Sequence, residues 1–149
     1  MYEDQVETPE EELKRADHLV FVSLKYTRTC DIMKNAIKRM IAADELVMGE
    51  FLEGLRKNKE LENVPRTIKE RVIMVKNILG SSGKKYLSLY NLLKKIDKAE
   101  YTATEEFRKN VTLRTKTSKP IDVKVENLYN YLDLTKEFVN FMRQKIKVK

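Results

Sequence analysis

The chain has 149 residues, of which 36% are charged and 42% are hydrophobic, and its formal net charge is +7. This length suits one domain, 1–149, and so many hydrophobic residues argue against a disordered chain. One cysteine and one histidine cannot provide an internal disulfide or a tetrahedral Cys/His zinc site. No run of residues approaches the roughly 18 apolar residues of a membrane span, so we expect a cytoplasmic protein without membrane contact.

The charge is unevenly distributed along the chain. Residues 1–12 carry six acids and no base, so we expect an acidic tail over 1–8, and the remaining 137 residues have a net charge of +13. A basic body favours an anionic partner such as nucleic acid. Abundant Lys and Glu with little Gln, Cys and Trp are also typical of thermophile surfaces, which are rich in charge without any such partner.

The first helix is predicted to begin at Thr8-Pro9, because threonine caps helices and proline suits the first helical position. Apolar residues then recur at helical spacing, and further apolar residues fall outside that stripe: Leu19, Phe21 and Val22. The pattern predicts a helix that is buried on more than one side or that forms a dimer seam.

Four more helices follow a predicted break over 26–31. Their apolar periodicity covers 31–55, 68–79, 86–96 and 128–146. Between the last two, residues 111–125 alternate apolar and polar side chains, which predicts a small β-hairpin. The expected fold is therefore all-α, a five-helix bundle with one hairpin between the fourth helix and the last.

Two carboxylates, Asp17 and Asp44, fall on the apolar stripes of the first and second helices. A buried carboxylate requires a base, several hydrogen-bond donors or a metal ion. For Asp44 we expect a structural pairing, with Arg71 as the candidate partner. The alternative is a Mg²⁺-dependent ribonuclease-like enzyme that uses Asp17, Asp44 and Glu50; outside that alternative, no cofactor or metal site is expected.

The basic segment over 108–125 is the main candidate for function. Residues 108–124 carry six bases against one acid, Asp122: Arg108, Lys109, Arg114, Lys116, Lys119 and Lys124. On a hairpin, Arg114 and Lys116 would share one face, which suits a phosphate backbone. Nearby tyrosines could stack on bases, although tyrosines at helical spacing are also typical of a core: Tyr101, Tyr129 and Tyr131.

The helical layout, the basic insert and the ending NLYNYLDLTKEFVNFM resemble small prokaryotic bundles of the HEPN superfamily, many of which are ribonucleases or components of toxin systems. The R-x4-6-H motif of that family is absent, because the only histidine, His18, has Arg15 three residues before it. The resemblance therefore implies a helical fold and no HEPN-type RNA cleavage.

The segment GEFLEGL, Gly49 to Leu55, is similar to the E-F-L-G-D run of the ribonuclease III endonuclease domain, which is helical and dimeric. Glu50, Phe51 and Leu52 match, whereas Glu53 and Gly54 replace that family's glycine and catalytic aspartate. No catalytic role is carried over from this resemblance.

From the sequence we therefore expect a non-catalytic module that binds RNA or another polyanion through residues 108–124. We also expect a homodimer, formed through the first helix or through a second apolar stripe at Leu134 and Phe141. A purely structural or assembly protein without a nucleic-acid role is the remaining interpretation.

Overall fold

The computed structural model describes residues 7–147, which form four continuous helical segments and a three-stranded sheet. The first segment joins α1 (Pro9–His18), the π-helical turn η2 (Leu19–Ser23) and α2 (Leu24–Tyr26). The second is α3 (Cys30–Lys57). The third joins α4 (Ile68–Leu79), the 3-10 turn η3 (Gly80–Gly83) and α5 (Lys84–Lys98), and the fourth is α6 (Val125–Lys147). Residues 1–6 of the predicted acidic tail lie outside the described residues.

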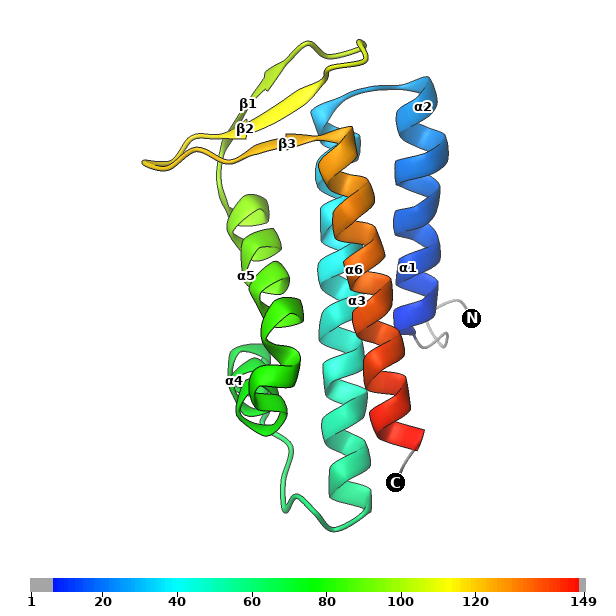
Figure 1. Ribbon diagram of the computed structural model, residues 1–149, viewed down its shortest axis with the longest axis vertical. Helices are drawn as coiled ribbons and strands as arrows, with labels where there is room; N and C mark the ends of the chain where they lie inside the picture. Colours follow the sequence, from blue (N-terminus) through cyan, green and yellow to red (C-terminus); the bar gives the residue numbers. More distant parts are fainter. Residues whose placement is uncertain (1–6, 148–149) are drawn as a thin grey trace.

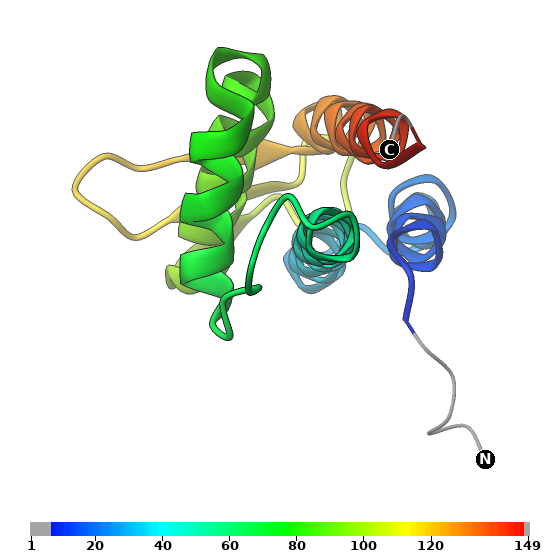
Figure 2. The same ribbon diagram turned by 90° about the horizontal axis from the view of Figure 1, so that it is seen from below.

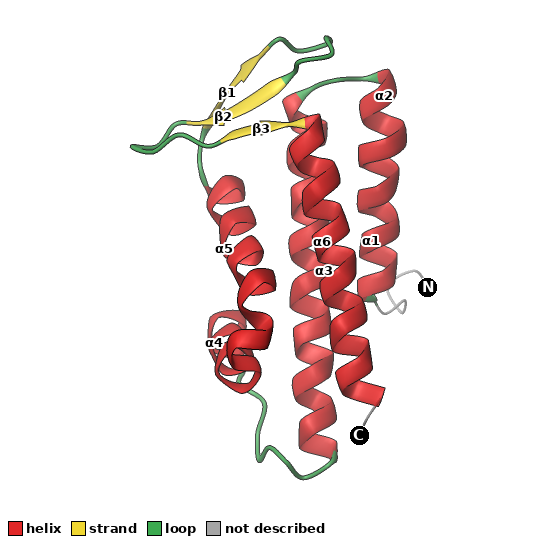
Figure 3. Cartoon of the chain, viewed as in Figure 1, coloured by secondary structure: helices red, strands yellow, loops and turns green. Residues whose placement is uncertain are grey.

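Helix α3 is the central element of the bundle. It contacts α1 and α6 on one side and α4 and α5 on the other, and Figures 1 and 2 show these helices arranged around it. The sheet lies across one end of the helices, beside the start of α3 and of α6 (Figure 3). Within the described residues, no helix is both long and apolar enough to cross a bilayer.

Threonine side chains cap the N-termini of three helices. Thr8 Oγ1 accepts a hydrogen bond from the backbone N–H of Glu11 at 3.1 Å, and Thr29 Oγ1 accepts one from Ile32 at 3.4 Å. Each bond satisfies an N–H group that has no partner within its own helix. The predicted start of the first helix and the predicted break before the second are confirmed. Thr67 caps α4 in the same way.

Within the single chain, the first helix is not buried on more than one side, and its role as a dimer seam stays a prediction. Phe21 and Val22 are 47% and 41% exposed, because this helix packs against α3 and α6 only on one side. The π-helical turn also alters the direction of its side chains. The backbone N–H of Leu24 bonds to the carbonyl of Leu19, so this turn contains one residue more than an α-helical turn.

The third and fourth predicted helices are joined, which is why the described chain has four helical segments and not five. Gly80, with φ +59° and ψ −137°, ends α4 and donates its N–H to the carbonyl of Lys76. The chain then continues directly through the 3-10 turn into α5. We infer that the glycine bends the helical path because only a residue without Cβ adopts these angles easily.

The sheet has three strands where the sequence predicts two. Strands β1 (Tyr101–Thr104), β2 (Thr112–Thr115) and β3 (Asp122–Lys124) pair antiparallel in that order. The predicted alternation is confirmed for β3, where Val123 is buried between two exposed residues, and only in part for β2, where Thr112 is buried beside Leu113. Strand β1 has no such pattern, because three of its four residues are exposed. The fold is thus mostly helical with a small sheet, and the expected all-α class is corrected.

Candidate nucleic-acid interface

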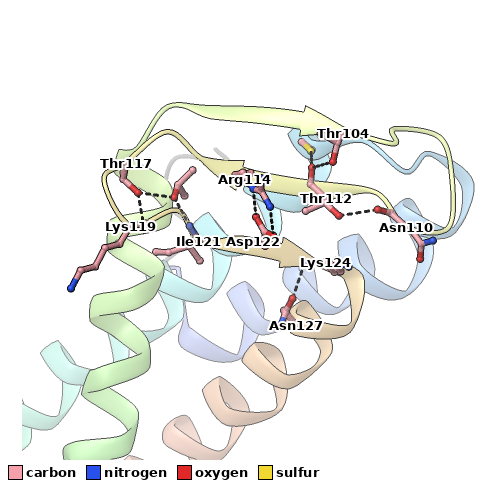
Figure 4. Close-up of polar contacts among 12 residues, drawn as sticks. Thr104, Asn110, Thr112, Arg114, Thr117, Lys119, Ile121, Asp122, Lys124 and Asn127 are labelled. Carbon is pink, nitrogen blue, oxygen red and sulfur yellow. Dashed lines mark hydrogen bonds and ion pairs between the residues drawn. The ribbon is translucent and has the colours of Figure 1, made fainter.

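The six predicted basic residues do not form one cluster. Arg108 and Lys109 lie in the loop between β1 and β2, whereas Lys119 lies in the loop between β2 and β3, at the opposite end of the sheet. Figure 4 shows the two loops leaving the sheet in different directions. Three other members lie on or directly beside the strands: Arg114, Lys116 and Lys124. The predicted interface over 108–124 is therefore divided into two ends and a central face.

The central face is less positive than the sequence suggests. Arg114 is paired with Asp122, its neighbour on β3, by two hydrogen bonds of 2.7 and 2.9 Å. This pairing lowers the pKa of the Asp122 carboxyl, so the carboxylate stays charged beside the arginine. The positive charge of Arg114 is therefore compensated within the protein.

The loop between β1 and β2 is attached to the start of α3. The Glu106 carboxylate accepts a hydrogen bond from the backbone N–H of Cys30 at 2.8 Å, and the N–H of Phe107 donates to the carbonyl of Arg28 at 2.7 Å. Phe107 has φ +67° and is 73% exposed. A bulky residue in this backbone region is strained, and an exposed ring is not held there by core packing. These contacts place Phe107 and Arg108 next to Arg28.

Beside this loop, a surface hollow of about 320 Å³ lies between the first helical segment and the start of α6. Among the described residues, none that lines it carries a carboxylate. We call it the aromatic–basic hollow, and its lining residues are Val20, Phe21, Leu24, Lys25, Arg28, Val125 and Tyr129. The rings of Phe21 and Tyr129 lie parallel, with centroids 5.1 Å apart, and Tyr129 is 40% exposed. The π-helical turn is the segment that carries Phe21 to this position.

Of the three tyrosines considered from the sequence, only Tyr129 lies in this hollow. The hydroxyl of Tyr101 donates to Asp31 at 2.7 Å, and that bond raises the pKa of Tyr101 to about 12. Tyr131 is half-buried against the core, and burial raises its pKa. The sequence reasoning missed Lys25 and Arg28, because nothing in a helix pattern indicates that residues 25–28 meet a loop some 80 residues later.

The carboxylates of the enzyme alternative are not brought together. Asp17, which the sequence places on the core side, is 44% exposed and pairs with Lys136 at 2.7 Å. Glu50 pairs with Arg143, and it lies six residues from Asp44, on a different face of α3. Within the described residues, no group of three His, Cys, Asp or Glu side chains is placed to hold a metal ion.

Asp44 is buried as predicted, but it has no ion-pair partner among the described residues. Its side chain is 2% exposed, and Oδ1 has no hydrogen-bond partner among the described residues. The candidate partner, Arg71, instead donates Nε to the carbonyl of Pro65 at 2.7 Å. Burial, with a smaller effect from the neighbouring Glu45, raises the pKa of Asp44 well above its usual value. The expected structural pairing is therefore wrong.

A different buried acid forms ion pairs, with two arginines whose side chains are 42% and 45% exposed. Glu12 is 3% exposed and pairs with Arg15 at 2.6 Å and with Arg39 at 3.2 Å. The sequence does not reveal this cluster, because Arg39 comes from α3 and is 27 residues away. Cys30 is fully buried, and burial raises the pKa of its thiol to about 11. That thiol is unsuited to nucleophilic chemistry.

No family model, curated protein or solved structure matches this chain. The resemblances to the HEPN superfamily and to the ribonuclease III domain therefore stay predictions.

Proposed function

We propose that this protein is a non-catalytic module that binds single-stranded RNA through the aromatic–basic hollow and the adjoining loop between β1 and β2. The proposed partner is the RNA or polyanion expected from the sequence. Its main contacts lie at the hollow and the adjoining loop, and not along the whole of residues 108–124. Of the predicted residues, Arg108 and Lys109 belong to this surface, whereas Arg114, Lys116, Lys119 and Lys124 are outside it.

The observation that carries the proposal is the combination of exposed aromatic rings with four bases, two in the hollow and two in the adjoining loop, which outnumber the two acids of that loop, Glu105 and Glu106. Phe21, Tyr129 and Phe107 are all at least 40% exposed, and none of the residues that line the hollow is acidic. Proteins that bind single strands use aromatic rings for base stacking and a positive groove for the phosphates. Base stacking is available only where bases are unpaired, which favours single strands over duplexes.

The contact between the rings of Phe21 and Tyr129 has a structural explanation as well, because their stacking packs η2 against α6. It does not explain Phe107, which is exposed in a loop and held in a strained backbone conformation. The local excess of positive charge, from Lys25, Arg28 and Arg108, is likewise not required by the packing of the helices.

The experiment is fluorescence anisotropy with labelled RNA of about 12 nucleotides, a length within the range that such modules cover. Single- and double-stranded forms are compared at about 50 and about 200 mM salt, with Mg²⁺ and with a chelator. We expect saturable binding of the single strand that weakens at the higher salt, and intact RNA under every condition. Mg²⁺-dependent cleavage would contradict the non-catalytic proposal.

Two variants locate the interface. Arg108→Ala should reduce the affinity about tenfold at the lower salt and flatten the salt dependence, because one phosphate contact is lost. Phe107→Ala should reduce the affinity by a similar factor and leave the salt dependence unchanged, because it removes stacking. The matched control is Lys69→Ala, on α4 away from the sheet, which changes the net charge by the same amount. Equal losses in all three variants would contradict a defined site.

A second candidate function is self-assembly, because Phe21 and Val22 are exposed apolar residues on the helix that the sequence predicts as a dimer seam. In that case, light scattering at micromolar concentration shows a dimer, and Val22→Lys converts it to a monomer. A monomer that binds RNA supports the module and contradicts the predicted homodimer.

A further inference from the structure

At the other end of the sheet, a second hollow lies between the last turns of α5 and the loop between β2 and β3. Its volume is about 580 Å³. We call it the lysine pocket, and its lining residues are Leu92, Lys95, Lys98, Ala99, Thr115, Thr117, Ser118, Lys119 and Ile121. In Figure 1 this loop extends beyond the upper end of α5. We propose that the lysine pocket binds a small organic phosphate of about nucleotide size, independently of RNA binding at the aromatic–basic hollow.

Charge is the first observation that supports this site. Three ammonium groups line the pocket, from Lys95, Lys98 and Lys119, and none of the described lining residues carries a carboxylate. None of the three forms an ion pair within the described residues, whereas the neighbouring Lys94 and Lys38 pair with Glu45 and Asp97. A pocket with three uncompensated ammonium groups favours a ligand with about two negative charges, as a phosphate monoester has near neutral pH.

The loop that carries Lys119 is held in place by hydroxyl groups (Figure 4). Thr115 Oγ1, which is buried, accepts the N–H of Ile121 at 2.8 Å and lies 3.0 Å from the hydroxyl of Thr117. The Thr117 hydroxyl donates to the carbonyl of Lys119 at 3.0 Å. The loop conformation is therefore set before any ligand arrives, which reduces the entropy lost on binding.

The backbone of the same loop supplies further donors. Within the described residues, the N–H groups of Thr117, Ser118 and Lys119 have no hydrogen-bond partner in the protein. Free N–H groups in a turn, beside lysine side chains, are a common means of binding phosphate oxygens. The Ser118 hydroxyl is exposed and adds another donor.

Size and apolar lining distinguish an organic phosphate from inorganic phosphate. A volume of about 580 Å³ lies within the usual range of pockets for small organic ligands and exceeds what one phosphate ion fills. Leu92, Ala99 and Ile121 are half-buried and form the apolar part of the lining. A ring or alkyl group attached to the phosphate would cover these side chains while the lysines hold the charge.

The test is calorimetric titration of the full chain with AMP and with inorganic pyrophosphate, and with adenosine as the probe that lacks phosphate. We expect saturable binding of AMP, weaker binding of pyrophosphate, and none of adenosine. Replacing both Lys95 and Lys119 by Gln should weaken AMP binding more than tenfold. The charge-matched control, which replaces Lys76 and Lys69 on α4 by Gln, should leave it unchanged.

Three results would overturn the proposal: no saturable binding of either phosphate probe, binding of adenosine as tight as that of AMP, or an equal loss in the α4 control. Circular dichroism of each variant confirms that it is folded. Arg108→Ala separates this site from the RNA interface, because it lies outside the lysine pocket. AMP binding that is lost in Arg108→Ala and kept in the Lys95 and Lys119 variant would place AMP at the aromatic–basic hollow, and it too would overturn the proposal.

Discussion

Arg114 and Asp122 lie directly opposite each other on β2 and β3, and the guanidinium donates to both carboxylate oxygens. The most central base of the basic segment is thus compensated by the only acid within it. Both side chains are exposed, so the pair mainly sets the charge of the sheet surface and contributes little to folding.

Arg114→Ala is therefore expected to reduce RNA affinity by less than twofold, because the variant removes a charge that Asp122 already balances. Asp122→Asn should raise the affinity slightly, because it leaves Arg114 free for phosphate. Anisotropy titrations at about 50 mM salt check both effects. A loss in Arg114→Ala as large as in Arg108→Ala would show that the sheet face belongs to the interface.

The buried carboxyl of Asp44 should make stability depend on pH. Because folding raises the pKa of Asp44 above its usual value of 3.8, the folded protein holds a proton that the unfolded chain releases. Stability is therefore lost as pH rises from about 4 through the folded pKa. Asp44→Asn, which cannot ionise, should be more stable than the natural chain by about 1–3 kcal/mol at about pH 8, and nearly equal at about pH 4.

Urea unfolding at the two pH values measures this difference for Asp44. Glu45 and the Tyr90 hydroxyl, which bonds to Glu45 at 2.6 Å, lie beside the buried carboxyl and are unchanged in the variant. A stability difference that is the same at both pH values would show that Asp44 does not titrate in this range.

Glu106 should stabilise the loop between β1 and β2 through the N-terminus of α3. Glu106→Ala removes the acceptor for the Cys30 N–H and should cost about 1 kcal/mol. Amide exchange in residues 106–111 should accelerate, and RNA affinity should fall with it. Glu105→Ala, which removes the neighbouring exposed carboxylate and therefore the same charge, is the control and should leave amide exchange unchanged.

Gly80 and Gly54 provide opposite expectations for the same substitution. A Cβ at either position meets no atom within 4 Å, so only the backbone conformation differs. Gly80→Ala should cost about 1–3 kcal/mol, because φ +59° with ψ −137° is strained for alanine. Gly54→Ala, inside α3, should stabilise by about 0.5–1 kcal/mol. Thermal unfolding compares the two, and a stabilising Gly80→Ala would contradict the assigned backbone angles.

Local patterns in the sequence predict most of the secondary structure. The cap at Thr8, the break before α3 and the apolar face of α5 depend on residues close in the chain, and all are confirmed. Strand β1 is not predicted because three of its four residues are exposed, so it carries no alternation of burial. The break at Gly80 was predicted, but its continuation into η3 depends on tertiary packing, which local propensity does not describe.

The candidate sites were harder to predict because they combine distant segments. The aromatic–basic hollow joins Phe21 to Tyr129, which are 108 residues apart, through the packing of η2 on α6. The lysine pocket joins Lys95 to Lys119 through the position of a loop. A count of bases over 108–124 includes Arg108 and Lys109 of the RNA surface and Lys119 of the lysine pocket, but it cannot reveal that the two ends face different surroundings. The pairing of Asp44 with Arg71 was predicted incorrectly for a related reason. Helical periodicity predicts which side chains are buried, but it does not identify the residues that surround them.

The π-helical turn has a consequence for the whole first segment. Residues spaced by four drift about 40° around an α-helix at each step, yet Glu12, Ala16, Val20 and Leu24 are all buried along one side. The additional residue in η2 offsets part of that drift. Buried side chains spaced by four residues can therefore continue to face α3 and α6. Deleting one residue from this turn would restore α-helical geometry and would rotate Leu24 and everything after it, up to the loop before α3, out of phase with the core. The packing of this helix therefore does not accommodate the loss of even one residue from the turn, although much of the helix surface faces solvent.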